Sequence, residues 1–308
     1  SERQAYTGPF HAQIDLTNRC TNQCLVCWFR SPLLGTAAQG YAVRDRELPT
    51  AMAERLLHDL AQLQCHEVHF SGGGDPFSHA ACCGLIERAR QEGLAVRLTC
   101  NGRGLHPPVI DRLLAAGLEQ LTVSLWAASA ATYTATHPGT TVGDYLQLIE
   151  NMRYLHARRT AAGVKYLTIT NVIFRTNFHE IPQMVTLAAE LGADQCNLVL
   201  FDPILPAYQG LLIDGDAVVQ LRQLLGEAKR LGEKYRLNMS QLDTWLQRLD
   251  HPQDAVSGEY DRHAVNAVPC YSAWQNCRIL ADGGVVPCYS AFDKPLGNLH
   301  QRDFAQIW

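Results

Sequence analysis

The alternation of short β-rich runs with amphipathic stretches is the feature that most restricts the fold of this chain. Between the runs, leucines and methionines recur at helical spacing, as in 51–64 and 144–159. Strands that alternate with helices predict a parallel sheet with right-handed crossovers. The expected strands span residues 13–16, 67–71, 95–99, 121–125, 166–174 and 195–201.

The number of these strand–helix units sets the architecture. Six units occupy about 190 residues, whereas a closed eight-unit barrel typically takes about 250 residues. We therefore predict an α/β fold built on an open, partial (β/α)6 barrel.

The rest of the chain predicts two further regions. A long helix is expected at 215–234 and a shorter one from Ser240, followed by a polar linker at 251–268. The Cys- and Gly-rich end predicts a small module with a hairpin around Asp282-Gly283-Gly284. The predicted domains are the barrel at 1–212, a helical linker region at 213–268 and the hairpin module at 269–308.

Composition and charge argue against several classes of protein. The 308 residues include 26 Lys and Arg against 30 Asp and Glu, a net charge of −4, which does not suit a nucleic-acid binder that depends on phosphate contacts. No apolar run reaches the roughly 18 residues of a membrane helix. The first ten residues also lack the apolar segment of a secretion signal. We therefore expect a cytoplasmic protein with neither a membrane nor a nucleic-acid partner.

The cysteines indicate metal binding rather than disulfides. Their number, eleven, is odd, and in a reducing cytoplasm clustered cysteines more often bind metal or do redox chemistry. Two groups are clustered, at Cys20, Cys24 and Cys27 and at Cys270, Cys277 and Cys288. The others are interpreted as small buried hydrophobic residues, at Cys65, Cys82, Cys83, Cys100 and Cys196.

The first group follows directly on the first expected strand, with three and then two residues between its cysteines. A closed iron–sulfur cluster takes four thiolates. Three thiolates would leave one iron with an open position, as catalytic metal sites have, and a small chelating ligand could occupy it. A zinc knuckle or three core cysteines are the alternatives.

Further motifs stand at the ends of the next three strands. The second strand ends in Ser71-Gly72-Gly73-Gly74-Asp75-Pro76, the third in Asn101-Gly102, and the fourth in Ser124. Barrel folds place their active sites at these C-terminal strand ends. With the C-x3-C-x2-C spacing, these motifs make residues 11–202 resemble the radical S-adenosylmethionine (SAM) superfamily.

The resemblance implies a 4Fe–4S cluster held by Cys20, Cys24 and Cys27, with SAM chelating the remaining iron. One electron, from a donor such as flavodoxin or ferredoxin, cleaves SAM to a 5′-deoxyadenosyl radical, which takes a hydrogen atom from the substrate. The cofactor carries this chemistry, and the protein supplies placement and exclusion of water.

The resemblance also implies which residues surround SAM. Gly72, Gly73 and Gly74 would let the backbone approach the methionine moiety, and Asp75 would help to hold its ammonium group. Asn101 and Ser124 would hydrogen-bond the carboxylate or ribose, unless they are satisfied strand-end polar residues. The other candidates are Trp28 to cover the cluster or adenine, His137 or Arg175 to pair with the carboxylate, and Asn171 to touch the ribose. An exposed loop position is the alternative for Arg175.

The second cysteine group resembles the opening of the SPASM and twitch extensions of the same superfamily. Cys270, Gly283 and Cys288 have the spacing of a Cys, a Gly hairpin and a Cys, which implies an auxiliary iron–sulfur cluster. A zinc site or a hairpin with free thiols is the alternative. We expect Cys277 to be the third cluster ligand, with a hydrogen-atom donor to a substrate radical or a packing residue as the alternatives.

The substrate is the least determined part of the prediction. Few residues precede the first strand, so we expect no N-terminal peptide-binding domain. Because twitch-bearing relatives oxidise or epimerise sugar and aminocyclitol carbons, we expect a small polar, carbohydrate-like substrate. A peptide-modifying maturase or epimerase is the alternative within the family. A non-catalytic iron–sulfur or zinc binding protein is the alternative of another class.

Overall fold

The fold is built around one curved sheet. The computed structural model describes residues 7–37, 45–159, 163–201, 203, 206–213, 215–249, 269–289, 291–292 and 294–308. Within these residues the sheet has nine strands in the order β6-β5-β4-β3-β2-β1-β7-β8-β9. The strands are β1 (His11–Ile14), β2 (Glu67–Phe70), β3 (Ala95–Cys100), β4 (Leu118–Ser124), β5 (Val164–Ile173), β6 (Gln195–Leu200), β7 (Asn276–Ile279), β8 (Gly284–Val286) and β9 (Gly297–Asn298).

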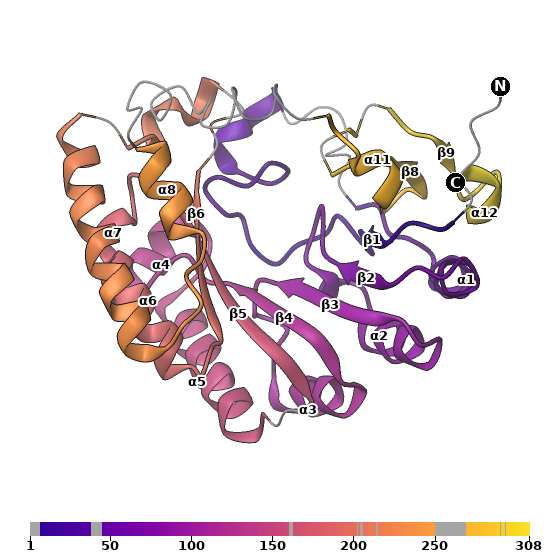
Figure 1. Ribbon diagram of the computed structural model, residues 1–308, viewed down its shortest axis with the longest axis horizontal. Coiled ribbons are helices and arrows are strands. Elements are labelled where there is room, and N and C mark those ends of the chain that lie inside the picture. The colour runs from indigo at the N-terminus through magenta and orange to yellow at the C-terminus, as the bar shows by residue number, and fades with distance from the viewer. Residues whose placement is uncertain are drawn as a thin grey trace.

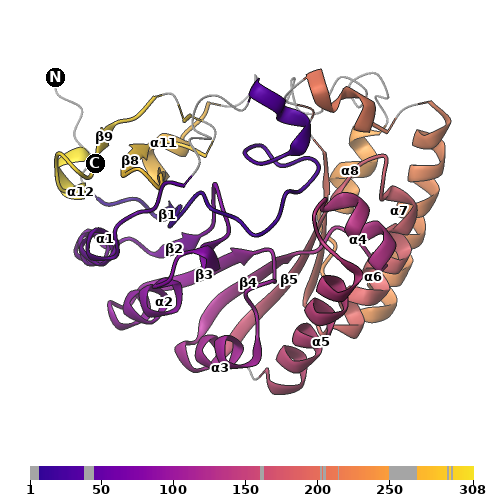
Figure 2. The ribbon, with the colours of Figure 1, turned by 180° about the vertical axis from the view of Figure 1, so that it is seen from behind.

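Helices cover the outer side of this sheet (Figures 1 and 2). The α-helices are α1 (Thr50–Gln62), α2 (Cys82–Gln91), α3 (Pro107–Ala116), α4 (Ala130–Thr136), α5 (Val142–Arg158), α6 (Ile181–Glu190), α7 (Asp216–Tyr235), α8 (Leu242–Arg248), α11 (Ser272–Gln275) and α12 (Phe304–Ile307). Short 3-10 helices are η1 (Pro32–Ala37), η2 (Pro76–Ser78), η3 (Phe178–Glu180) and η4 (Pro206–Leu211). No helix in this described part of the chain is long and apolar enough to cross a membrane.

The predicted α/β architecture with an open sheet is confirmed. Strands β1 to β6 are each paired in parallel with their neighbour, and β6 and β9 end the sheet without meeting. All the expected strands form, but β4 begins earlier than expected. Gly117, at a φ of +77°, ends α3 and is followed at once by the strand. The expected linker at 251–268 lies outside the described residues.

The helices form where the apolar periodicity of the sequence predicts them. On α5, Leu148, Met152 and Leu155 are buried against the sheet. A capping box begins the same helix, because the Thr141 hydroxyl accepts the Asp144 backbone N–H while the Asp144 carboxylate accepts the Thr141 N–H. These features fix the helix start close to the end of the loop that follows α4.

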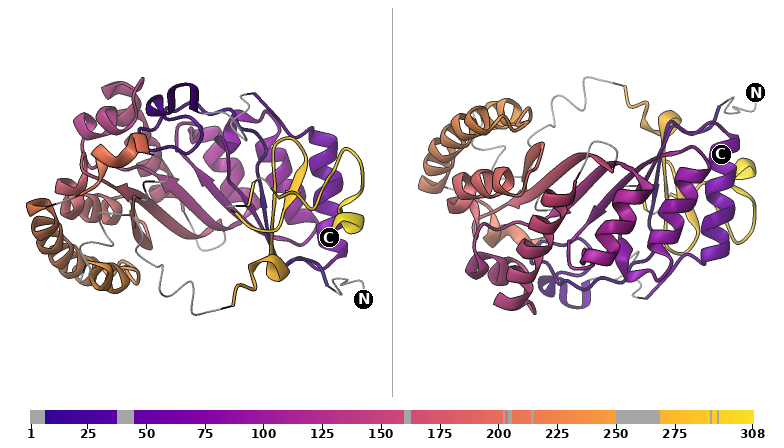
Figure 3. Two further views of the ribbon diagram at one scale, coloured as in Figure 1. Left: turned by 90° about the horizontal axis from the view of Figure 1, so that it is seen from above. Right: turned by 90° about the horizontal axis from the view of Figure 1, so that it is seen from below.

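The C-terminal hairpin extends the barrel sheet. Strand β7 pairs in parallel with β1, with Ala12 opposite Cys277 and Ile14 opposite Ile279, and β8 and β9 follow in antiparallel order. Seen from above, the hairpin lies beside β1 at one end of the sheet, while α7 and α8 lie at the other (Figure 3). The boundary at 269 stays a prediction, since the hairpin shares both the sheet and the apolar core of the barrel.

Candidate active site

A cavity of about 380 Å³ lies at the C-terminal ends of the parallel strands. It receives side chains from the loops or last residues of β1 to β6, as barrel folds do at this end. The cavity is lined by Cys20, Cys24, Val26, Cys27, Trp28, Phe29, Ser71, Gly72, Gly74, Asp75, Thr99, Cys100, Asn101, Ser124, Trp126, Val172, Val199, Leu200 and Phe201. Thus the first cysteine group and the strand-end motifs predicted from the sequence converge on one cavity.

The cysteine loop after β1 is held by its own backbone. The Cys27 N–H donates to the Cys24 carbonyl at 3.1 Å. The Asn22 backbone N–H donates to the Cys20 sulfur at 3.4 Å, and the Phe29 N–H donates to the Cys27 sulfur at the same distance. Burial raises the pKa of all three thiols, most strongly that of Cys24. These thiols therefore ionise only with a compensating positive charge, which bound metal supplies.

The three thiols suit a multinuclear cluster better than a single ion. Among the described residues, no three His, Cys, Asp or Glu side chains converge as ligands of one metal ion. In a 4Fe–4S cluster each thiolate binds a different iron, so the ligands need not meet at one point. The buried Trp126 indole N–H, which has no hydrogen-bond partner among the described residues, also suits a cavity that holds a ligand.

The glycine turn after β2 packs tightly on the cysteine loop. Gly72 has a φ of +129°, and a Cβ there would overlap the Asp15 carboxylate. A Cβ at Gly74 would overlap the Arg19 carbonyl oxygen, one residue before the first cysteine of the loop. The Gly73 N–H donates to Asp15 Oδ2 at 3.2 Å. Besides any approach to a ligand, the turn therefore needs glycines for contact between the two loops.

Asp75 and Asn101 tie three strand ends together. The buried Asp75 carboxylate accepts backbone N–H groups from Phe77 at 3.0 Å and from Asn101 at 2.7 Å. Burial raises the pKa of Asp75 to about 6. The Asn101 side-chain amide donates to Thr21 Oγ1 at 3.0 Å and to Cys20 Sγ at 3.6 Å. Asn101 therefore contacts the cysteine loop directly.

Of the residues predicted to surround SAM, Gly73, Asn171, Arg175 and His137 do not line the cavity. Val172 faces the cavity, so its neighbour Asn171 faces the helices, where its amide donates to Cys196 Sγ. Arg175 is exposed outside the cavity. His137 is buried behind Trp126 and stacks on Tyr133 with ring centroids 4.5 Å apart. Burial lowers the pKa of His137 to about 4, so at neutral pH it has no charge to pair with a carboxylate.

An apolar wall is the part of the cavity that the sequence analysis missed. It consists of Trp126, Val172, Val199, Leu200 and Phe201. Trp126 follows β4 with a φ of +61°, an uncommon conformation for an aromatic residue. The only signal in the sequence was an apolar run at the end of the sixth strand, which is equally typical of a buried strand.

The three cysteines of the second group lie in different surroundings. Cys270 is exposed, Cys288 is half-buried, and Cys277 is fully buried in the main apolar core. Burial raises the pKa of the Cys277 thiol well above its ordinary value, and the nearby Cys65 thiol adds to this effect. These surroundings do not support the ligand or hydrogen-donor role expected for Cys277, and they match the packing alternative.

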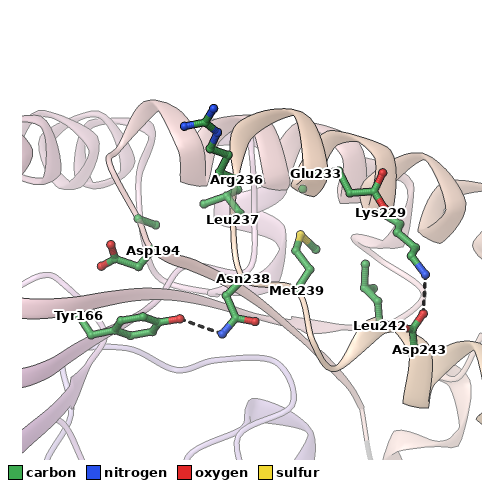
Figure 4. Close-up of a pocket in the computed structure, with 12 residues that line it drawn as sticks. Tyr166, Asp194, Lys229, Glu233, Arg236, Leu237, Asn238, Met239, Leu242 and Asp243 are labelled. Atoms are coloured by element: carbon green, nitrogen blue, oxygen red, sulfur yellow. Dashed lines mark hydrogen bonds and ion pairs between the residues drawn. The ribbon is translucent and has the colours of Figure 1, made fainter.

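A larger cavity of about 630 Å³ lies at the opposite ends of the strands, between β5, α7 and α8 (Figure 4). Two pairs of its polar groups satisfy each other: the Asn238 amide donates to the Tyr166 hydroxyl at 2.9 Å, and Lys229 pairs with Asp243 at 2.7 Å. Ligands of open α/β sheets bind at the carboxyl ends of the strands instead. We therefore place the active site in the cysteine-lined cavity.

Comparisons with known proteins agree with this site. Residues 14–188 match the family model of the radical SAM superfamily, and residues 270–308 match that of an iron–sulfur cluster-binding domain, SPASM. The PqqA peptide cyclases of Xanthomonas euvesicatoria and Gluconobacter oxydans are each 27% identical over 97% of this chain, which spans 74% and 76% of their lengths. Streptococcus suis SuiB bound to SAM has a similar fold, with a TM-score of 0.69 at 16% identity. That match covers 98% of this chain and 66% of SuiB.

The matched families imply the cofactors that the sequence predicted. The radical SAM region implies a 4Fe–4S cluster and SAM, and the SPASM region implies an auxiliary iron–sulfur cluster. Membership of this superfamily also decides between an enzyme and a non-catalytic iron–sulfur or zinc binding protein. The chain belongs to the radical SAM superfamily, and it is a radical SAM enzyme with a C-terminal SPASM-like region.

Proposed function

We propose that this enzyme modifies a peptide, forming a new bond within it. The observation that carries the proposal is the match to the peptide cyclases, which covers 97% of the chain and so includes both the barrel and the C-terminal hairpin. This match favours the peptide alternative over the carbohydrate-like substrate that the sequence analysis put first.

The proposed site has two parts with different chemistry. Cys20, Cys24 and Cys27 would hold the 4Fe–4S cluster, which with SAM supplies a radical able to take a hydrogen atom from a C–H bond. The turn at 72–74, with Asp75 and Asn101, would position SAM beside them. Apart from Gly73, these residues line one cavity, so SAM and the cluster would share it.

The apolar wall would hold the peptide side chain that reacts. Val172, Val199 and Leu200 come from the two strands at the open end of the sheet. An aromatic or aliphatic side chain can bury its surface there, while the polypeptide on either side remains outside the cavity. The wall also excludes water from the reacting carbon. An external one-electron donor, such as flavodoxin or ferredoxin, would reduce the cluster.

The test uses the reconstituted, reduced enzyme with SAM and the short peptides encoded beside its gene. Mass spectrometry should find a peptide that has lost two hydrogens, together with 5′-deoxyadenosine. One hydrogen atom would leave on 5′-deoxyadenosine, and the second would leave as a proton while its electron passes to the auxiliary iron–sulfur cluster that the SPASM region implies. The Cys20→Ala/Cys24→Ala/Cys27→Ala variant is the control and should give neither product. A panel of sugars and aminocyclitols, tested in parallel, addresses the alternative. Stimulation of 5′-deoxyadenosine formation by a sugar, with no change in any peptide, would overturn the proposal.

A further inference from the structure

A buried ion pair joins the two ends of the chain next to the active site. Asp15, just after β1, is fully buried, and the Arg278 side chain on β7 is 5% exposed. The Arg278 guanidinium donates from Nη2 to Asp15 Oδ2 at 2.7 Å and from Nε to Oδ1 at 3.0 Å. Since 263 residues separate the partners, the C-terminal hairpin supplies the counter-charge for a carboxylate of the barrel.

The guanidinium is fixed by further contacts. Its Nη1 donates to the Tyr289 carbonyl at 2.9 Å. Its central carbon lies 4.7 Å from the ring centroid of Phe292 and 5.9 Å from that of Phe29. Phe29 belongs to the cysteine loop and lines the active-site cavity. Arg278 therefore contacts the hairpin region and the cysteine loop, and it holds Asp15 in one orientation.

The Asp15 carboxylate also supports the glycine turn. It accepts the Gly73 N–H at 3.2 Å, and Gly72 lies so close that a Cβ would overlap it. The carboxylate thus lies between the guanidinium and the backbone of the turn. A carboxylate stays charged in such a buried place only when it is paired and hydrogen-bonded.

We propose that Arg278 is a positioning residue for SAM, which acts through Asp15 on the turn at 72–74. Without the guanidinium, the Asp15 carboxylate loses the hydrogen bonds from Arg278 Nε and Nη2 that fix its orientation. Its contact with the Gly73 N–H is then weaker, and the turn can shift. The hairpin region would then affect SAM binding through a side chain, independently of any iron it carries. The proposal concerns SAM and does not depend on the peptide substrate proposed above.

The experiment compares Arg278→Gln with wild type as reconstituted enzymes. SAM binding is measured by equilibrium dialysis, and hydrogen exchange is measured in peptides that contain Gly73. We expect the Kd for SAM to rise about 10- to 100-fold, which corresponds to a loss of about 1.4–2.8 kcal/mol of binding free energy. Exchange at Gly73 should become faster, and KM for SAM should rise more than kcat falls in 5′-deoxyadenosine formation.

A matched control separates positioning from general loss of stability. Arg159→Gln breaks the ion pair with Asp194 at the opposite ends of the strands, so it should lower stability while leaving the Kd for SAM unchanged. If Arg278→Gln does not fold, Arg278→Lys decides, because it keeps the charge but loses the paired geometry. We expect about a two- to fivefold rise in Kd for the lysine variant. The deciding variant is Arg278→Gln, or Arg278→Lys if the glutamine variant does not fold. If its Kd for SAM stays within twofold of wild type and its Gly73 exchange is unchanged, the proposal is wrong.

Discussion

Gly74 offers a direct test of the contact between the glycine turn and the cysteine loop. A Cβ at this position would lie 2.6 Å from the Asn18 carbonyl carbon and would also overlap the Arg19 carbonyl oxygen. Ordinary contacts begin near 3.4 Å, so clearing the Asn18 carbonyl carbon alone requires the loops to move apart by about 0.8 Å, and clearing the nearer Arg19 oxygen requires more. Both obstructing groups are backbone, which no side-chain rotation can relieve.

The expected consequence is a change in activity with the cluster retained. Misplacement of catalytic groups by about 1 Å costs up to about 100-fold in rate, so 5′-deoxyadenosine formation by Gly74→Ala should fall about 10- to 100-fold. Iron content should stay near wild type, because Cys20, Cys24 and Cys27 lie on the same loop and move together. Overpacking of this kind typically lowers the free energy of unfolding by about 1–3 kcal/mol.

Gly84→Ala is the matched control for this substitution. No atom lies within 4 Å of a Cβ at Gly84, which is in helix α2. An alanine there should raise the free energy of unfolding by up to about 1 kcal/mol and leave activity unchanged. Wild-type rates and wild-type SAM affinity in Gly74→Ala would refute the argument that this contact sets the spacing of the site.

Three further predictions follow from single side chains. Cys277→Ala should retain wild-type iron content and lose roughly 1–2 kcal/mol of stability, as a truncated core residue does. Loss of the iron of one cluster would instead show that Cys277 is a cluster ligand. The pKa of buried His137 is about 4, whereas that of a histidine in the unfolded chain is about 6.5. Between these pH values the unfolded chain binds a proton and the folded chain does not, so the free energy of unfolding decreases as pH falls from 6.5 towards 4. At pH 5 this amounts to about 2 kcal/mol, and urea unfolding of the cluster-free His137→Phe variant should lack that part of the pH dependence; an identical dependence would contradict the assignment. Asn101→Ala removes an N–H donor to Cys20 Sγ, so the midpoint potential of the cluster should become more negative, and a potentiometric titration showing a positive shift would speak against this role.

The local features of the fold could be read from the sequence because their causes are local. Apolar residues at helical spacing predicted α1 and α5, and turn residues marked the ends of the strands. The motif side chains Cys20, Gly72 and Asn101 could be placed at one edge of the sheet because parallel strands end on the same side. Each of these inferences needs only short-range spacing and the handedness of the crossovers.

The remaining features depend on pairings that leave no local trace. Strand β7 lies beside β1 although most of the chain separates them, so neither the covered edge of β1 nor the Asp15–Arg278 pair could be predicted from spacing. The face of a strand residue is equally hard to predict, since a shift of one residue moves a side chain to the other side of the sheet. This is why Asn171 was expected in the cavity, which Val172 lines instead. The position of Cys277 in the core could not be predicted either, because it also depends on which face of its strand the residue occupies.

The most direct test of the account is 5′-deoxyadenosine formation by wild type and by the Cys20→Ala/Cys24→Ala/Cys27→Ala variant, each reconstituted with iron and sulfide, reduced and given SAM. The account predicts product from wild type and none from the variant, which should keep the iron of the auxiliary cluster, about half of the total if both clusters are 4Fe–4S. SAM cleavage by the triple variant at the wild-type rate would contradict the assignment of the active site to this cysteine loop.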